Sequence, residues 1–163
     1  MIRFATIGTS AIVDRFLEAA ALCEGLVHTA VFSRKKETAK AFAKKHGAEF
    51  IYTDLKELAE SSDIDAVYIA SPNSCHCEQA VEMLKHGKHV LCEKSITLNS
   101  AELSEAAELA REHHVVLAEA MTIYHMPIYR RAAGYRRLRP LPGPLVLLGD
   151  TGSDNLPGPL CPH

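Results

Sequence analysis

Short apolar runs alternate with helix-like stretches over roughly the first 120 residues, and this alternation limits the possible folds more than any other feature of the sequence. The helix-like stretches carry apolar residues three and four positions apart, which is the period of an amphipathic helix. Strands that are each followed by a helix imply a parallel sheet, and right-handed crossovers place helices on both faces. We therefore predict an α/β fold with a doubly wound parallel sheet. Its predicted strands are residues 2–7, 26–32, 49–52, 66–70, 89–92 and 115–120.

Local signals predict several helix ends and the helix faces that are buried. Asp54 is a suitable N-cap for a short helix over residues 55–60, and Asn99 with Glu102 resembles a capping box. Gly47 is expected to end the second helix. The side chains expected to face the core are Ile12, Phe16 and Ala19 in the first helix, Ala39, Phe42 and Ala43 in the second, Cys77, Ala80, Val81 and Leu84 in the fourth, and Leu103, Ala106, Ala107 and Ala110 in the fifth.

The chain divides into a predicted domain over residues 1–135 and a tail over residues 136–163. Six of the eight prolines lie from Pro140 onward, and proline does not easily continue a helix or a central strand. We interpret the tail as mostly irregular or as the truncated start of a second domain. Residues 146–148 are compatible with one more short strand.

Composition excludes several classes of function. The net charge is −2, so the overall charge does not indicate a nucleic acid or an acidic membrane as a partner. No apolar run is long enough to span a bilayer, and the first strand begins without a signal peptide, so we expect a cytoplasmic location. The five cysteines lack the paired spacing of a disulfide framework. Cys75-His76-Cys77 has no matched second pair that would complete a zinc site, so we expect no metal.

The turn after the first strand is the first candidate site. A dinucleotide fingerprint has the pattern Gly-x-Gly-x-x-Gly, and here Gly8 supplies the first glycine alone. Ser10 stands at the second position, where its hydroxyl can donate to a phosphate oxygen, and Val13 at the third. The N–H groups at the start of the following helix favour an anion. The motif by itself fits an ordinary strand-to-helix turn equally well.

The end of the second strand indicates which dinucleotide is bound. NAD-specific domains usually place an acidic residue there to bind the ribose 2′-hydroxyl, whereas this chain has Ser33 and Arg34. A serine and a forked guanidinium can hold a 2′-phosphate. Cations at a helix start oppose the helix dipole unless an anion is bound. We therefore predict NADP as the cofactor, with NAD as the alternative.

Two further candidate sites follow the fourth and fifth strands, at the edge of a parallel sheet where ligands bind. The first is Ser71-Pro72-Asn73 with His76, and the second is Glu93-Lys94. A lysine there can donate a proton or stabilise a developing negative charge on a substrate oxygen. The simpler interpretation is a surface lysine that pairs with Glu93.

The order of these motifs resembles that of the Gfo/Idh/MocA oxidoreductases over residues 1 to about 135. The motifs are Gly8-Thr9-Ser10, Ser33-Arg34, Ser71-Pro72-Asn73 with His76, Glu93-Lys94 and Glu119-Ala120-Met121. The resemblance implies a Rossmann fold and NAD(P)-dependent chemistry on sugars, polyols and related compounds. It implies that Gly8, Thr9, Ser10 and Ile12 line the pyrophosphate, and that Ser33 and Arg34 hold the adenosine ribose and its phosphate. It also implies that Ser71, Pro72, Asn73 and His76 border the cofactor, that Lys94 with Glu93 lies at the active site, and that Glu119 and Met121 close the nicotinamide pocket.

Two departures from that family pattern affect the expected function. Ser95 replaces the proline of the family's Glu-Lys-Pro, so the turn after Lys94, often with a cis peptide bond, is not assured. The family's second domain, with its Asp-x-x-x-His pair and usual dimer interface, has no match here. The resemblance therefore implies the cofactor half of an oxidoreductase with a small-molecule substrate. The alternatives are a non-catalytic module that binds or senses NADP(H), and an α/β domain for another nucleotide.

Overall fold

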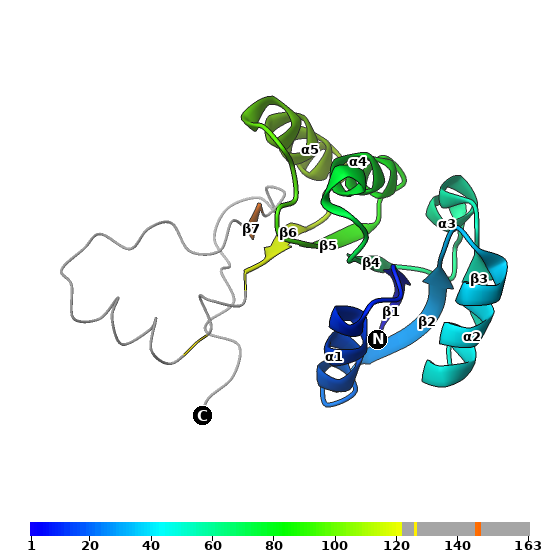
Figure 1. Cartoon of the computed structure of the whole chain (residues 1–163). Helices are drawn as coiled ribbons and strands as arrows, with labels where there is room; N and C mark the ends of the chain where they lie inside the picture. The colour runs from blue at the N-terminus through cyan, green and yellow to red at the C-terminus, as the bar shows by residue number, and fades with distance from the viewer. Residues whose placement is uncertain (122–125, 127–145, 148–163) are drawn as a thin grey trace.

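A seven-stranded sheet in the order β3-β2-β1-β4-β5-β6-β7 forms the centre of the protein (Figure 1). The computed structural model describes residues 1–121, 126 and 146–147. The first six strands pair in parallel, which confirms the doubly wound α/β prediction. The last strand pairs antiparallel with β6. The strands are β1 (Ile2–Ile7), β2 (Leu26–Phe32), β3 (Phe50–Tyr52), β4 (Ala66–Ile69), β5 (His89–Glu93), β6 (Leu117–Ala120) and β7 (Val146–Leu147).

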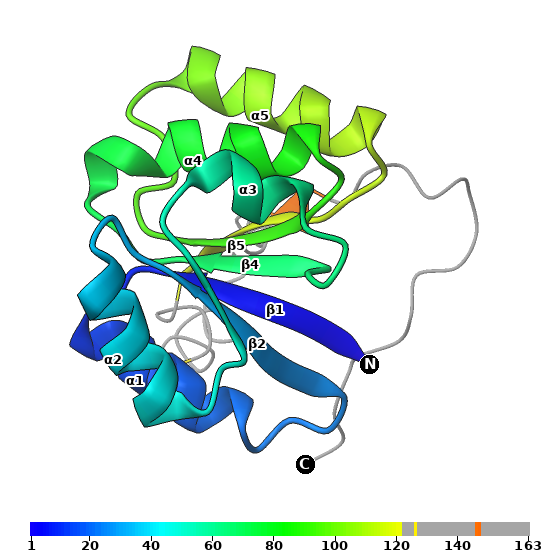
Figure 2. The same cartoon turned by 90° about the vertical axis from the view of Figure 1, so that its right-hand side faces the viewer.

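Helices cover the sheet on both faces, as Figure 2 shows. The helices are α1 (Ala11–Ala20), α2 (Lys36–His46), α3 (Leu55–Glu60), α4 (His76–Lys85) and α5 (Ser100–Glu112), with a 3-10 turn, η1 (Asn73–Cys75), before α4. Helices α1 and α2 pack with Phe4, Val31 and Tyr68 on one face. Helices α3, α4 and α5 pack with the alternate strand residues, such as Ile7 and Ile69, on the other. Because successive side chains of a strand point to opposite faces of the sheet, each strand contributes residues to both halves of the core.

Several local predictions hold. Asp54 caps α3, because its carboxylate accepts from the N–H groups of Lys56 and Glu57 at 2.8 and 3.1 Å. Gly47 ends α2 with a φ of +73°. Asn99 caps α5 by accepting from the Glu102 N–H at 2.9 Å. The buried residues of α2 are Ala39, Phe42 and Ala43, and those of α5 are Ala106, Ala107 and Ala110.

The buried residues of α1 lie one position from the predicted ones, although Phe16 packs against the core as predicted. The residues that face the core are Val13, Leu17 and Ala20, whereas Ile12 is 39% exposed. Both stripes are apolar at helical spacing, so periodicity does not choose between them. In α4, Ala80 and Leu84 are buried as expected, and Val81 is partly buried against the core. Met83 and His76 are also buried, whereas Cys77 is only partly buried. The sixth strand begins at Leu117 rather than Val115, because the Val115 N–H donates to the Ala110 carbonyl at the end of α5.

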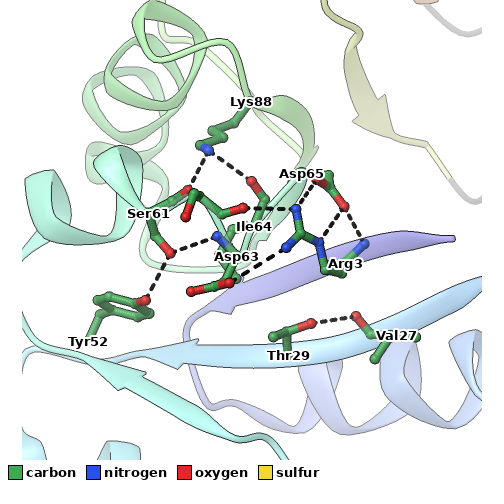
Figure 3. Close-up of polar contacts among 10 residues, drawn as sticks. Arg3, Val27, Thr29, Tyr52, Ser61, Asp63, Ile64, Asp65 and Lys88 are labelled. Atoms are coloured by element: carbon green, nitrogen blue, oxygen red, sulfur yellow. Dashed lines mark hydrogen bonds and ion pairs between the residues drawn. The ribbon is translucent and has the colours of Figure 1, made fainter.

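A polar network ties together the amino-terminal edge of the sheet (Figure 3). The Arg3 guanidinium donates to both carboxylate oxygens of Asp65, at 2.7 and 3.1 Å, which joins β1 to the start of β4. These hydrogen bonds from Arg3 lower the pKa of Asp65 to about 2. The Lys88 ammonium donates to the carbonyls of Ser61 and Ile64 at 2.6 and 2.8 Å. The charges at this edge are therefore engaged within the fold.

The tail assigned to residues 136–163 lies outside the described residues except at β7 (Val146–Leu147), which matches the short strand suggested by the sequence. In the described parts of the chain, every helix is too short or too polar to cross a membrane.

Candidate functional site

The strand order reverses between β1 and β4, and the carboxyl ends of these strands open into two adjoining hollows. Such a switch point is where doubly wound sheets bind ligands. We call the two hollows together the carboxyl-edge groove. Its Arg34 half, of about 290 Å³, is lined by Ile7, Gly8, Thr9, Ser10, Phe32, Ser33, Arg34, Ala70, Ser71, Pro72, Cys75 and Gln79. Its Lys94 half, of about 510 Å³, is lined by Ser10, Ile12, Ala70, Ser71, Pro72, Asn73, His76, Glu93 and Lys94.

The groove brings together residues that the sequence placed at four separate strand ends. All of the predicted site residues line it except Glu119 and Met121. The Glu119 carboxylate instead accepts from the Ile96 N–H at 2.9 Å, so it holds the loop that follows Lys94. The Met121 N–H donates to the Glu119 carbonyl at 2.9 Å. Gln79 also lines the groove and was not predicted, because nothing in its sequence neighbourhood marks it. Cys75, which lies between Asn73 and His76 in the sequence, lines the Arg34 half as well.

Gly8 allows β1 and the loop after β4 to approach each other closely. Its φ is +118°, and an added Cβ would lie 2.6 Å from the Ala70 carbonyl oxygen. The Ala70 N–H donates to the Ile7 carbonyl at 2.8 Å, which fixes this contact between the two strand ends. A residue with a side chain at position 8 would separate the strands at the floor of the groove.

The start of α1 is open to the groove. Ser10 is the N-cap residue by backbone geometry, yet its hydroxyl makes no capping hydrogen bond in the described structure. The hydroxyl and the first N–H groups of the helix therefore remain available to an anion. Val13 is fully buried and fills the place of the third fingerprint glycine, while Ile12 turns to the Lys94 half.

The Arg34 half presents an exposed cation at the end of β2. Arg34 lines the hollow together with Ser33, and none of the ion pairs among the described residues involves Arg34. Helix α2 begins with Lys36 directly after Lys35, so cations stand where the helix dipole is positive. This end of the groove is suited to an anionic group.

The loop Ser71–Asn73 lies at the junction of the two halves and is held from behind by α4. The Ser71 hydroxyl donates to the Gln79 side chain at 2.6 Å. His76 is fully buried, and its two ring nitrogens lie 2.8 Å from the Ser71 carbonyl oxygen and 2.9 Å from the Ser95 carbonyl oxygen. His76 therefore joins the loop after β4 to the loop after β5, and its polar atoms are engaged by the protein itself.

The Lys94 half contains a carboxylate and an ammonium side by side in sequence. Glu93 does not pair with Lys94 in the described structure: its Oε1 accepts from the Tyr68 hydroxyl at 2.7 Å. The simpler interpretation of Lys94 as the ion-pair partner of Glu93 is therefore not supported by the geometry. Lys94 is exposed in the groove, and the Lys94–Ser95 peptide bond is cis although Ser95 replaces the family's proline.

Another hollow, also of about 510 Å³, lies outside the carboxyl-edge groove, between the carboxyl ends of α1 and α2. Among its lining side chains, Lys45 and His46 already pair with Asp14 at 2.7 Å each, whereas the buried Nδ1 of His28 has no hydrogen-bond partner among the described residues. Burial, with a smaller effect from His46, lowers the pKa of His28 to about 4, so this imidazole is neutral near pH 7. We place the candidate site at the carboxyl-edge groove, because that groove lies at the switch point of the sheet.

Comparison with known proteins identifies the family of this chain. Residues 2–121 match the family described as "Oxidoreductase family, NAD-binding Rossmann fold", the Gfo/Idh/MocA family. The chain is 52% identical over 130 residues to scyllo-inositol 2-dehydrogenase (NADP(+)) IolU of Bacillus subtilis, covering 80% of this chain and 40% of that protein. It is 34% identical over 139 residues to 1,5-anhydro-D-fructose reductase of Ensifer adhaerens, covering 85% of this chain and 40% of that protein.

A solved structure shares the fold. The 3-ketoreductase KijD10 of Actinomadura kijaniata, in complex with TDP-benzene and NADP, superposes with a TM-score of 0.76 at 34% identity. The match covers 82% of this chain and 42% of KijD10. The chain thus spans about two fifths of the length of these relatives. The match to the family over most of the chain, together with the strand order and the groove, shows that this chain belongs to the Gfo/Idh/MocA oxidoreductases with an NAD-binding Rossmann fold.

Proposed function

We propose that the chain forms the cofactor half of an NADP-dependent oxidoreductase that acts on a sugar, a polyol or a related hydroxyl or carbonyl compound. The observation that carries the proposal is the groove that crosses the switch point from Arg34 to Lys94. Its ends match a dinucleotide, with a cation for a ribose phosphate at one end and a proton donor at the other. The relatives support it, because IolU is named for NADP and KijD10 was solved with NADP.

Each part of the groove has a distinct task in this proposal. Ser10 and the first N–H groups of α1 bind the pyrophosphate, and Ser33 with Arg34 binds the 2′-phosphate. Bound NADP supplies the redox chemistry, since its nicotinamide exchanges a hydride with a substrate carbon. Lys94 donates a hydrogen bond or a proton to the substrate oxygen at that carbon. The Ser71–Asn73 loop lines the junction of the two halves and borders the cofactor there.

Arg34 is expected to determine the preference for NADP. Replacing it with alanine removes a charge-assisted, forked pair with the 2′-phosphate, so the Kd for NADPH should rise about tenfold or more. The Kd for NADH should stay nearly unchanged. Both are measured by titration of cofactor fluorescence, because the chain contains no tryptophan.

Lys44→Ala is the matched control for Arg34→Ala. Lys44 is an exposed cation on α2 that does not line the groove, so its loss changes the net charge equally. Equal losses of NADPH affinity in the two variants would show that a diffuse charge, rather than a 2′-phosphate contact, is responsible. An unaltered chain that binds ATP but neither nicotinamide cofactor would contradict the proposed function.

Lys94→Ala is expected to lower turnover on a panel of sugars and polyols by about 10²- to 10⁴-fold, the range for loss of a general acid or base. NADPH affinity should change little, and Lys85→Ala, an exposed lysine on α4 outside the groove, should keep full turnover. Activity that survives Lys94→Ala would refute the catalytic assignment. An unaltered chain that binds NADPH without turnover would instead support the alternative of a non-catalytic NADP(H)-binding module.

A further inference from the structure

We propose that Tyr68 is a positioning residue, which holds the Glu93 carboxylate in the orientation that receives the nicotinamide half of the cofactor. This inference rests on the proposed function. Tyr68 itself does not line the groove, and its hydroxyl reaches the site by its hydrogen bond to Glu93. The ligand groups concerned are hydrogen-bond donors, namely the ribose hydroxyls or the carboxamide N–H of a nicotinamide riboside.

Tyr68 is held rigidly within the core. Its residue is 2% exposed on β4, and its ring stacks on Phe16 with centroids 3.8 Å apart and planes at 15°. Phe16 in turn meets the Phe4 ring edge-on at 5.8 Å. This aromatic column joins β1, α1 and β4 on one face of the sheet, so the position of the phenol oxygen is set by packing.

The phenol holds one oxygen of a carboxylate that reaches the groove from the neighbouring strand. Tyr68 pairs with Leu91 across β4 and β5, so Glu93 lies one pleat further toward the carboxyl edge on the same face. The Tyr68 hydroxyl donates to Glu93 Oε1 at 2.7 Å. Burial, with the Glu93 carboxylate, strongly raises the pKa of Tyr68, so the phenol stays protonated and remains a donor.

This arrangement leaves the second oxygen of Glu93 for a ligand. No hydrogen bond to Oε2 occurs within the part of the chain that the structure describes. Without the phenol, the Glu93 side chain gains rotamers and can turn toward the adjacent Lys94 ammonium. Tyr68 thus keeps a carboxylate and an ammonium apart in the groove, each with its own partner on a bound ligand.

Tyr68→Phe tests this role, because it keeps the aromatic stack and removes the hydroxyl alone. The Kd for NADPH should rise about three- to tenfold, the usual effect of one lost hydrogen bond. The Kd for adenosine 2′,5′-bisphosphate, which carries the adenosine half without nicotinamide, should stay unchanged. Equal weakening of both ligands would indicate a general structural effect and overturn the inference, as would unchanged NADPH binding.

A double-mutant cycle shows whether Tyr68 acts through Glu93. In a Glu93→Ala background, Tyr68→Phe should weaken NADPH binding less than twofold, whereas additive losses would overturn the inference. Tyr52→Phe is the control, since its hydroxyl donates to Ser61 Oγ at 3.0 Å and the residue lies outside the groove (Figure 3). Its NADPH affinity should match that of the unaltered chain.

The failure of this inference can be distinguished from the failure of the proposed function. If the unaltered chain binds neither NADPH nor the bisphosphate, the proposed function itself is wrong. If it binds both and Tyr68→Phe has no effect, this inference alone is wrong.

Discussion

Gly8→Ala is expected to destabilise the fold by about 3–5 kcal/mol and to abolish cofactor binding. Two effects combine at this position. The backbone φ of +118° is unfavourable for alanine, and the new Cβ would lie 2.6 Å from the Ala70 carbonyl oxygen. That oxygen is a backbone atom of a residue whose N–H is bonded to the Ile7 carbonyl, so it cannot move aside as a flexible side chain would. Urea unfolding measures the expected loss of stability, and titration with NADPH measures the expected loss of cofactor binding.

Gly25→Ala separates the clash at Gly8 from the cost of the backbone angle. Gly25 also has a positive φ, +86°, but an added Cβ there would meet nothing within 4 Å. We expect Gly25→Ala to lower the free energy of unfolding by about 1–2 kcal/mol and to leave the Kd for NADPH unchanged. If the two variants lost the same stability, the close approach of β1 to the loop after β4 would have no energetic weight.

His76→Ala is expected to lower the free energy of unfolding by about 3–5 kcal/mol. The resemblance to the family, in contrast, implies that His76 borders the cofactor. Its imidazole is fully buried and contacts the carbonyl oxygens of Ser71 and Ser95. A neutral ring donates from one nitrogen and a protonated ring from both. Removing the ring leaves a cavity and at least one carbonyl oxygen without its hydrogen-bond donor, so the midpoint of urea unfolding should shift markedly to a lower urea concentration.

His86→Ala is the matched control for His76→Ala on the same helix. The His86 ring is only half-buried at the end of α4, and its Nδ1 bonds to the Glu82 carbonyl at 2.9 Å. Its loss should cost about 1 kcal/mol or less. A cost for His76→Ala that is no larger would mean that the bridge between the two loops contributes little, and NADPH affinity should then also be unaffected.

The strand-helix order and the strand ends that form the groove are predictable from the sequence. Apolar runs with β-branched residues, separated by helical periods and by turn residues such as Gly47, predict a parallel sheet with little dependence on tertiary contacts. The right-handed crossover rule then leaves few ways to order the strands, and it brings Gly8, Arg34, Ser71 and Lys94 to one edge. These four residues were predicted by this route because each lies one or two residues after a strand. The roles of the full set of site residues came instead from the resemblance to the family.

The rotation of α1 and the partners of the site residues depend on the tertiary structure. Two apolar stripes on α1 are equivalent by period, and only the packing of the helix on the sheet shows that Val13, rather than Ile12, is buried. The bond from Tyr68 to Glu93 joins residues 25 positions apart that meet because β4 and β5 are neighbours. Periodicity describes one segment at a time, whereas side-chain partners are set by packing between segments. For that reason the sequence by itself determined the fold class and the ligand edge of this protein, and the packed structure alone decided that His76 joins two loops and that Glu93 is held by a tyrosine rather than by Lys94.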